Sequence, residues 1–223
     1  MPDFAAARRM MVDGQVRTSD VTDLRIIGAM LELPRERFVP EENAALAYLD
    51  LDLPAATASG GEPVRRLLKP MVLAKMVQAA AVKESDHVLD VGGATGYSSA
   101  LLARLARSVV ALEEEEALAP RARENLGAVG ARNVTVVTGP LTQGWPAKAP
   151  YDVILVEGAV EIVPPALSRQ LNAGGRLVAV VGRAPNGRAT VYRSVAGEVS
   201  GWPVFDAAAP LLPGFAAPPV FVF

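Results

Sequence analysis

The sequence contains no cysteine and a single histidine, His87. Without cysteine the chain can form no disulfide, no thiolate metal site and no cysteine nucleophile, and one histidine cannot build a polyhistidine metal centre. The sequence therefore predicts no metal site. His87 stands at the start of an expected strand, where a structural role is a simpler interpretation than a role as a base.

The chain also lacks an excess of charge of either sign, because 22 basic and 24 acidic side chains leave a net charge of −2. This balance gives no net attraction to nucleic-acid phosphates or anionic membranes. No apolar run approaches the length of a membrane span, and Asp13, Gly14 and Gln15 interrupt the stretch where a signal peptide needs an apolar core. We expect a cytoplasmic protein without nucleic-acid or membrane partners, and the oligomeric state stays open.

The 223 residues are enough for one α/β domain with a sizeable core. From residue 87 onward, short β-branched or leucine-rich runs alternate with helical segments, which is typical of a parallel sheet with crossover helices. The runs lack strict alternation, so both faces of the sheet should be covered. The expected strands are 87–91, 108–112, 133–137, 151–156, 175–182 and 189–195, and the expected helices are 97–106, 116–129 and 163–171.

Two flanking segments complete the expected single domain, 1–223. Residues 1–70 should form a helical segment, with helices over 1–46, followed by a turn-rich substrate loop that includes 51–63. Residues 71–200 should form the core. Residues 201–223 carry five prolines and should wander over the surface before "VFVF" adds an edge strand.

The second N-terminal helix has clear boundary signals. Ser19 or Thr22 is a candidate cap and Pro34 a candidate stop. A further helix should begin with Pro70 in its first turn. The expected buried face of the second helix consists of Leu24, Ile27, Met30 and Leu31.

A glycine-rich turn follows the first core strand in "VLDVGGATGYSS". Asp90 ends the strand, and Gly92, Gly93 and Gly96 let the backbone approach a ligand closely while the next helix directs its N–H groups at it. The dinucleotide pattern is G-x-G-x-x-G, whereas Gly92 and Gly96 stand four apart with Ala94 between them. This spacing is closer to the turn of S-adenosylmethionine-dependent methyltransferases.

A second feature lies at the expected distance along the chain. Glu113 closes the strand "SVVALE", 21 positions after Gly92, where a carboxylate can accept both ribose hydroxyls of a nucleoside. The alternative interpretation is structural: the glycines permit tight packing between strand and helix, and residues 113–116 form a solvated helix start favoured by the helix dipole.

The chain resembles the protein-L-isoaspartate O-methyltransferase family over nearly its whole length. The resemblance rests on colinear segments: "MVDGQVR…VTDLRIIGAMLELPRERFVPEE", "AYLDLDLP", "VLDVGGATGYSSALLARLA", "VVALEEEEALAPRARENLGAVGARNVTVVTG" and "GWPAKAPYDVILVEGAVEIVPPALSRQLNAGGRLVAVVG". It implies a doubly wound, mainly parallel seven-stranded methyltransferase sheet with an N-terminal helical extension. It also implies S-adenosylmethionine as methyl donor and isoaspartyl carboxylates of damaged proteins as acceptors.

Carried over by position, the resemblance implies that Asp90, Gly92 and Gly96 line the methionine side of the cofactor and that Glu113 holds its ribose. The full set of implied cofactor-binding positions is Asp90, Gly92, Gly93, Ala94, Gly96, Glu113, Pro140 and Leu141.

Three positions depart from the family pattern. The family has a serine or threonine two residues before a proline in its substrate loop, whereas "RLLKP" places Leu68 there, and leucine cannot make a side-chain hydrogen bond. Pro140 in "TGPLTQG" replaces an acid expected near the adenine amino group, which costs one hydrogen bond, worth about 0.5–1.5 kcal/mol. Ala94 replaces a glycine and adds a methyl group to the turn.

Other charged residues stand near this loop. Arg65, Arg66 and Lys69 could attract an anion, although a solvated helix start explains them equally well. Glu157 follows the fourth expected strand, at the edge of the sheet where such folds bind ligands, and is either a site residue or a loop carboxylate.

Methyl transfer demands mainly positioning of the acceptor, because the sulfonium is already activated. The absence of an evident catalytic acid or base is therefore no argument against activity. The leading hypothesis is a methyltransferase related to the isoaspartyl repair enzymes, acting on a protein or small-molecule acceptor. Two alternatives stay open: a methyltransferase with a less polar acceptor, suggested by Leu68, and a non-catalytic binding or sensing protein, suggested by Ala94 and Pro140.

Overall fold

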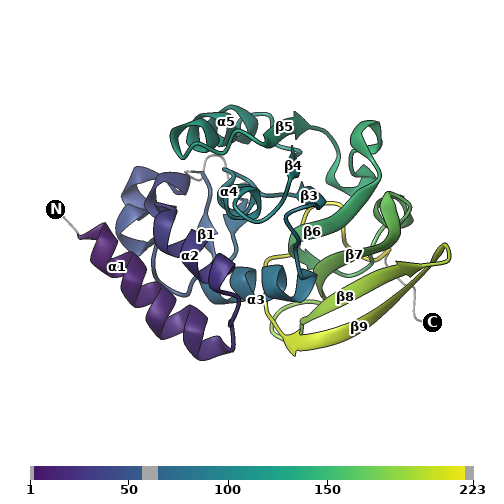
Figure 1. The fold of residues 1–223 in the computed structure, drawn as a ribbon, viewed down its shortest axis with the longest axis horizontal. Helices are drawn as coiled ribbons and strands as arrows, with labels where there is room; N and C mark the ends of the chain where they lie inside the picture. The colour runs from purple at the N-terminus through teal and green to yellow at the C-terminus, as the bar shows by residue number, and fades with distance from the viewer. Residues whose placement is uncertain (1–2, 57–64, 219–223) are drawn as a thin grey trace.

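A seven-stranded sheet forms the centre of the computed structural model, which describes residues 3–56 and 65–218 (Figure 1). The strand order is β5-β4-β3-β6-β7-β8-β9. The first five strands of this order run parallel to one another, β8 is antiparallel to β7, and β9 is antiparallel to β8. The strands are β3 (His87–Val91), β4 (Ser108–Glu113), β5 (Val134–Thr138), β6 (Tyr151–Val160), β7 (Leu171–Val181), β8 (Arg188–Val195) and β9 (Glu198–Asp206).

The path of the chain through the sheet reverses at β3. From β3 the chain moves outward through β4 to β5, and then returns to place β6 on the other side of β3. In an open parallel sheet, a crevice for ligands opens at such a reversal, outside the carboxyl ends of the strands. The turn after β3 and the final residues of β4 and β6 therefore share one edge of the sheet.

The sheet separates two hydrophobic cores. Successive residues of each parallel strand point to opposite faces, so neighbouring residues belong to different cores. The longer helices cover one face together with Ala207 and Ala209, and short helical segments together with Leu212 and Phe215 cover the other. The first core contains Val88, Val109, Val153 and Val178, and the second contains Leu89, Val110, Ile154 and Leu177.

The helices begin with an N-terminal segment that lies at the opposite end of the molecule from the β8–β9 hairpin (Figure 1). The α-helices are α1 (Phe4–Met11), α2 (Leu24–Glu32), α3 (Pro70–Ala80), α4 (Tyr97–Ala103), α5 (Leu118–Ala128) and α6 (Pro165–Ser168). Shorter helical turns are η1 (Val12–Val16), η2 (Arg17–Ser19), η3 (Arg35–Phe38), η4 (Glu41–Leu46), η5 (Leu141–Gln143) and η6 (Pro146–Lys148).

The expected helical stretch 1–46 is described from residue 3, and residues 3–46 are largely helical, but the details of α2 differ. Its cap is Asp23, whose carboxylate accepts from Arg25 N at 2.9 Å, and neither Ser19 nor Thr22. The amide oxygen of Gln78 on α3 accepts from the backbone N–H groups of Thr22 and Asp23. This long-range contact fixes where α2 begins, and a local sequence pattern cannot reveal it.

The buried face of α2 is also shifted from the expected one. Leu24 is 74% exposed, whereas Ile26, Ile27, Ala29 and Met30 are buried. The helix ends at Glu32, before Pro34, as expected. Pro70 occupies the first turn of α3, also as expected.

The turn-rich segment 51–63 is described over residues 51–56, which contain a short strand. β1 (Leu53–Pro54) pairs antiparallel with β2 (Arg66–Leu67). The backbone N–H of Ala55 also donates to Arg65 O at 2.8 Å. These contacts hold the stretch from Arg65 to Pro70 against the domain.

Three expected boundaries on the second half of the sheet are wrong. β6 runs on to Val160 and β7 already begins at Leu171, because bulges shift the register between these strands. The helix expected over 163–171 is therefore reduced to α6, Pro165–Ser168.

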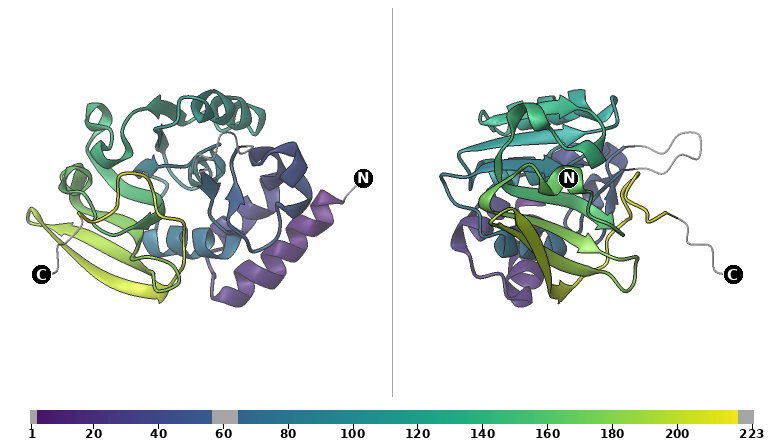
Figure 2. Two further views of the ribbon diagram at one scale, coloured as in Figure 1. Left: turned by 180° about the vertical axis from the view of Figure 1, so that it is seen from behind. Right: turned by 90° about the vertical axis from the view of Figure 1, so that its right-hand side faces the viewer.

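The tail expected to begin at residue 201 starts inside a strand. Gly201 to Asp206 belong to β9, which pairs with β8 as an edge strand, and an edge tolerates Pro203. Residues 207–218 then cross the back of the sheet, as the yellow segment of Figure 2 shows, and contribute Leu212 and Phe215 to the second core. The expected "VFVF" strand lies outside the described residues.

His87 has a structural environment at the start of β3. Its Nδ1 lies 2.7 Å from Ser108 Oγ, its Nε2 lies 3.0 Å from Lys148 O, and its ring stacks on Tyr151 at 4.9 Å. It therefore stands at the edge of the sheet opposite to the glycine turn.

In the part of the chain that the structure describes, no helix combines the length and apolar character needed to cross a membrane. The same residues contain no group of three His, Cys, Asp or Glu side chains that could hold a metal ion.

A buried ion pair joins α3, β7 and the loop before β3. Arg176 Nη2 donates to Asp86 Oδ2 at 2.6 Å, and Arg176 Nε donates to Ala80 O at 2.6 Å. Both side chains are largely buried. Loss of either partner would leave an uncompensated charge in the interior.

We therefore expect Arg176→Ala to lower the free energy of unfolding by about 3–5 kcal/mol, the usual effect of breaking a buried pair. Urea denaturation measures this change. The matched control is Arg188→Ala, because its partner Asp206 is exposed and such surface pairs contribute at most about 1 kcal/mol. Equal effects of the two substitutions would contradict the prediction.

Candidate active site

The turn after β3 has the backbone geometry that its glycines suggest. Gly92 and Gly96 have φ values of 78° and 95°, in the left-handed region where glycine is unstrained. Ala94 also lies there, with φ at 52°, so its methyl group does not prevent the turn from forming. A Cβ atom on Gly96 would touch Leu126 of α5 at 3.3 Å, so Gly96 permits close packing between the turn and α5.

Asp90 is fully buried beneath this turn. Its Oδ2 accepts from Ser98 Oγ at 2.8 Å and from Ser99 Oγ at 2.5 Å, both on α4. Burial raises the pKa of Asp90 to about 6, with a smaller contribution from the nearby Glu113 carboxylate, while the two serine hydrogen bonds oppose the rise. A Cβ atom on Gly93 would lie only 2.6 Å from this oxygen, so the turn needs glycine there.

Glu113 joins the end of β4 to the turn. Its Oε2 accepts from Ala94 N at 2.9 Å, and its Oε1 accepts from Glu114 N at 2.8 Å and Glu115 N at 3.2 Å. The side chain is buried, so the interpretation of residues 113–116 as a solvated helix start is wrong for Glu113. Its carboxylate faces the same space as the backbone of Gly92.

That space is filled by Arg65. Its Nη2 donates to Gly92 O at 2.6 Å and to Glu113 Oε2 at 3.4 Å. A Cβ atom added to Gly92 would lie 2.4 Å from this nitrogen and 3.4 Å from Leu141 Cδ1. We call the space bounded by Gly92, Ala94, Glu113 and Leu141 the cradle; the Arg65 guanidinium occupies it.

The structure separates the three basic residues near the substrate loop. Arg65 is buried, Arg66 is exposed and donates to Asp52 O at 3.0 Å, and Lys69 is partly exposed. The interpretation of these residues as a solvated helix start is therefore wrong for Arg65, which is buried, whereas Arg66 is exposed as that interpretation requires.

Pro140 and Leu141 follow β5 at the edge of the cradle. Leu141 is buried and packs in the second core, while Pro140 precedes η5. Gly139 N donates to Glu113 O at 3.1 Å, which holds this loop against the end of β4. The side chains at positions 140 and 141 provide an apolar border and no hydrogen-bonding group.

Leu68 is a core residue. Its side chain is 2% exposed and packs in the first hydrophobic core, and its carbonyl oxygen accepts from Arg35 Nη2 at 2.8 Å. Arg35 is itself completely buried, donates from Nε to Ala47 O at 2.9 Å, and lies over the Tyr97 ring at 4.6 Å. The N-terminal segment is thereby fastened to the substrate loop.

Glu157 lies inside β6 and is buried, so the interpretation as a loop carboxylate is wrong. Burial raises the pKa of Glu157 well above its usual value, and the nearby Asp90 raises it further, while Arg35 and Arg65 oppose the rise. Glu157 also borders a small cavity of about 40 Å³ between Arg65 and Arg66 on one side and residues 210–213 on the other.

Unsatisfied polar groups are concentrated around this edge of the sheet. Among the described residues, six buried side-chain atoms have no hydrogen-bond partner, and five of them belong to this region. Such groups are rare in native proteins and call for an explanation, such as a ligand or a water molecule. The five atoms are Arg35 Nη1, Arg65 Nε, Asp90 Oδ1, Tyr97 OH and Glu157 Oε1.

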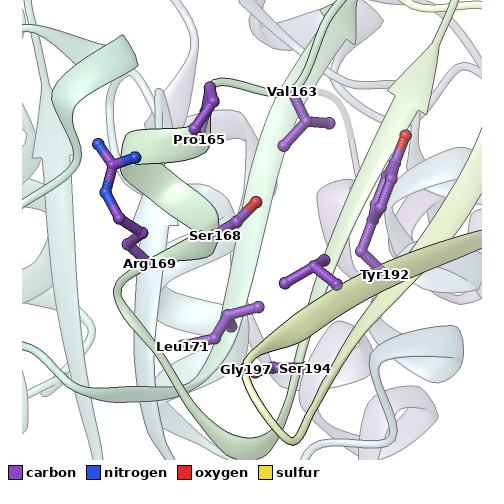
Figure 3. Close-up of a pocket in the computed structure, with 9 residues that line it drawn as sticks. Val163, Pro165, Ser168, Arg169, Leu171, Tyr192, Ser194 and Gly197 are labelled. Atoms are coloured by element: carbon purple, nitrogen blue, oxygen red, sulfur yellow. The ribbon is translucent and has the colours of Figure 1, made fainter.

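A more spacious cavity lies elsewhere. It has a volume of about 560 Å³ and lies between α6 and the β8–β9 hairpin, with Tyr192, Ser168 and Arg169 among its borders (Figure 3). None of its lining residues belongs to the glycine turn or to the end of β4. It contains no carboxylate, so the candidate active site is the cradle.

The parallel sheet that reverses at β3, the glycine turn after β3 and the acid that closes β4 define the fold of S-adenosylmethionine-dependent methyltransferases. Within this class the chain belongs to the protein-L-isoaspartate(D-aspartate) O-methyltransferase family, whose model matches residues 7–203.

Curated relatives agree with this assignment. A protein-L-isoaspartate O-methyltransferase of Koribacter versatilis is 39% identical over 196 residues, which cover 88% of this chain and 86% of the relative. One of Methanoculleus marisnigri is 41% identical over 175 residues, which cover 78% and 77% of the two chains.

Solved structures confirm the fold. One titled protein-L-isoaspartate O-methyltransferase superposes with a TM-score of 0.80 at 26% identity, covering 93% of this chain and 66% of that one. A second, from Plasmodium falciparum, is described as a putative enzyme of the same name in complex with S-adenosyl-L-homocysteine. It superposes with a TM-score of 0.75 at 16% identity, covering 95% and 99% of the chains.

Sequence reasoning missed two residues of this region. The sequence does not single out Arg35, because it stands in the charged stretch "RERF", and charged side chains in such a stretch are usually exposed. Arg65 was placed in a basic cluster, and its burial follows only from the pairing of β1 with β2, which no local pattern indicates.

The raised pKa of Asp90 has a measurable consequence for stability. The folded protein binds the Asp90 proton more tightly than the unfolded chain, so this contribution to stability is present below about pH 4 and is lost as the pH rises through about 6. Relative to Asp90→Asn, the wild type should therefore lose about 3 kcal/mol of unfolding free energy between pH 4 and pH 7.

Urea denaturation of both proteins across this range tests the prediction. The groups facing Asp90, namely Ser98, Ser99, Glu113, Arg65 and Glu157, are common to both proteins, and because Asp90 also raises the pKa of Glu157, the difference between the two stability curves includes the titration of both carboxyls. Parallel stability curves would show that Asp90 does not titrate in this range.

Proposed function

We propose that this protein transfers a methyl group from S-adenosylmethionine to the carboxylate of isoaspartyl residues in proteins. The observation that carries the proposal is the cradle, in which the backbone of Gly92 and the carboxylate of Glu113 meet at the reversal point of the sheet. Family membership makes this chemistry the natural one for the cradle.

The chemistry of the cradle fits the proposed cofactor. Gly92 O and Glu113 Oε2 are hydrogen-bond acceptors that already hold a cationic donor, the Arg65 guanidinium. An ammonium group and ribose hydroxyls are likewise donors, so they suit the same acceptors. The absence of a side chain on Gly92 leaves space that a Cβ atom would close.

When bound, the cofactor supplies a methyl group already activated by the adjacent sulfonium. The residues of this chain then have positioning roles. Glu113 holds the ribose, Gly92 and Gly93 allow close approach of the backbone, and Pro140 and Leu141 border the base. Asp90 maintains the turn through Ser98 and Ser99.

A carboxylate acceptor is ionised at neutral pH and needs no general base. The chain must therefore mainly position the acceptor and exclude water. An acceptor that differs from isoaspartyl residues remains the second candidate, and the observation in its favour is the burial of Leu68 in the core. In either case the acceptor, protein or small molecule, is not nucleic acid, and we propose the cytoplasm as the place of action.

The first test is calorimetric titration of the purified protein with S-adenosylhomocysteine. We expect binding in the wild type, and a roughly ten- to hundredfold weaker affinity for Glu113→Gln, since a hydrogen bond to a charged group contributes about 1.5–3 kcal/mol. The control is Glu114→Gln, whose side chain is exposed and whose affinity should be unchanged. No binding by the wild type at millimolar ligand would refute the proposed function.

A second test concerns the acceptor. Leu68→Ser places a hydroxyl in a packed core, and we expect it to lower the unfolding free energy by about 2–5 kcal/mol, as other large-to-small core substitutions do. Methylation of an isoaspartyl peptide is assayed for both proteins. Activity in the wild type supports the isoaspartyl acceptor, whereas activity that appears only with Leu68→Ser supports the second candidate.

A further inference from the structure

We propose that Arg65 serves two ligands in turn: its guanidinium fills the cradle until the cofactor displaces it, and the displaced guanidinium then binds the carboxylate of the acceptor. This inference rests on the proposed function and assigns a positioning role to a residue outside the glycine turn. It predicts that Arg65 opposes the binding of one ligand and favours the binding of the other.

The first half follows from where Nη2 lies. It is 2.6 Å from Gly92 O and 3.4 Å from Glu113 Oε2, the same two acceptors that the proposed function assigns to the cofactor. A second hydrogen-bond donor cannot reach these two acceptors while the guanidinium occupies the space in front of them. The Arg65 guanidinium must therefore leave before Gly92 and Glu113 can bind another molecule.

Glu113 tolerates this exchange because most of its hydrogen bonds come from the backbone. Ala94, Glu114 and Glu115 donate N–H groups to its carboxylate independently of Arg65. The turn and the end of β4 thus stay joined when the guanidinium moves. Removal of the Arg65 charge should leave the fold intact.

The second half of the proposal, the binding of the acceptor carboxylate, rests on the surroundings of Arg65 Nε. Arg65 Nε is buried and has no hydrogen-bond partner, and Arg65 borders the 40 Å³ cavity that also contains Glu157. Once displaced from the cradle, the guanidinium loses two acceptors and needs an anion, because an unpaired buried charge is strongly unfavourable. Glu157 is a poorer partner than a solvated carboxylate, because burial raises its pKa and disfavours its charged form.

A carboxylate acceptor meets this need. Guanidinium groups bind carboxylates through two parallel hydrogen bonds, which fix both position and orientation. Leu68 leaves the substrate loop without a side-chain donor at its position, and Arg65 lies three residues before it. Arg65 can therefore supply the polar contact that Leu68 cannot.

The experiment compares wild type, Arg65→Gln, Arg65→Lys and the control Arg188→Gln. Calorimetry gives the Kd for S-adenosylhomocysteine, and a methylation assay at saturating cofactor gives KM and kcat for an isoaspartyl peptide. For Arg65→Gln we expect Kd to fall about tenfold and KM to rise about tenfold, with little change in kcat. Arg65→Lys, which keeps the charge, should recover part of the acceptor affinity.

The control Arg188→Gln removes an exposed charge that pairs with the exposed Asp206 and that borders neither the cradle nor the 40 Å³ cavity, so it should change neither constant. If the role of Arg65 were purely structural, Arg65→Gln would weaken the binding of both ligands together or lower kcat. It would not lower Kd while raising KM. Thermal melting of each variant verifies that it is folded.

Each outcome has a distinct meaning. Failure of every protein, wild type included, to bind S-adenosylhomocysteine refutes the proposed function itself. Binding by the wild type that is unchanged or weakened in Arg65→Gln overturns the cradle half of the inference. Tighter cofactor binding with an unchanged KM overturns the acceptor half alone. An isoaspartyl peptide that neither reacts with the wild type nor binds to its complex with S-adenosylhomocysteine refutes the isoaspartyl acceptor of the proposed function, and the acceptor half with it.

Discussion

Mutual compensation among buried charges at the carboxyl edge of the sheet is the constraint on which the rest of this structure depends. Asp90, Glu113 and Glu157 lie there with Arg35 and Arg65, all within the interior. No single pair neutralises the group, because Glu113 relies on backbone N–H groups, Asp90 on serine hydroxyls, and Arg35 on carbonyl oxygens. The glycine turn, the substrate loop and the N-terminal segment are held in place by these contacts.

The sequence was most informative where a local pattern decides the structure. The bounds of β3 agree with the expected 87–91, and Asp90, Gly92, Ala94 and Glu113 come together as the glycine turn and its spacing to Glu113 predict. The sequence did not predict the features that depend on contacts between distant segments of the chain. The start of α2 depends on Gln78, the burial of Arg65 on the β1–β2 pair, and the length of β6 on bulges against β7.

The three departures from the family pattern differ in how strongly they change the structure of the site. Ala94 retains the left-handed conformation and uses its N–H group to hold Glu113, so the backbone does what a glycine would do. Pro140 costs a polar contact at the border of the cradle. Leu68 has the largest effect, because its side chain has joined the hydrophobic core and turned a polar loop position into a packing position.

The segment that crosses the back of β6 also affects when the site is completed during synthesis. A Cβ atom on Gly158 would lie 2.6 Å from Leu212 Cγ, so β6 and residues 210–213 are fitted closely to each other, and the latter form one wall of the cavity beside Glu157. Those residues follow all seven strands in the chain. A ribosome must therefore translate the whole sheet before this wall exists, and the nascent chain has no finished site until then.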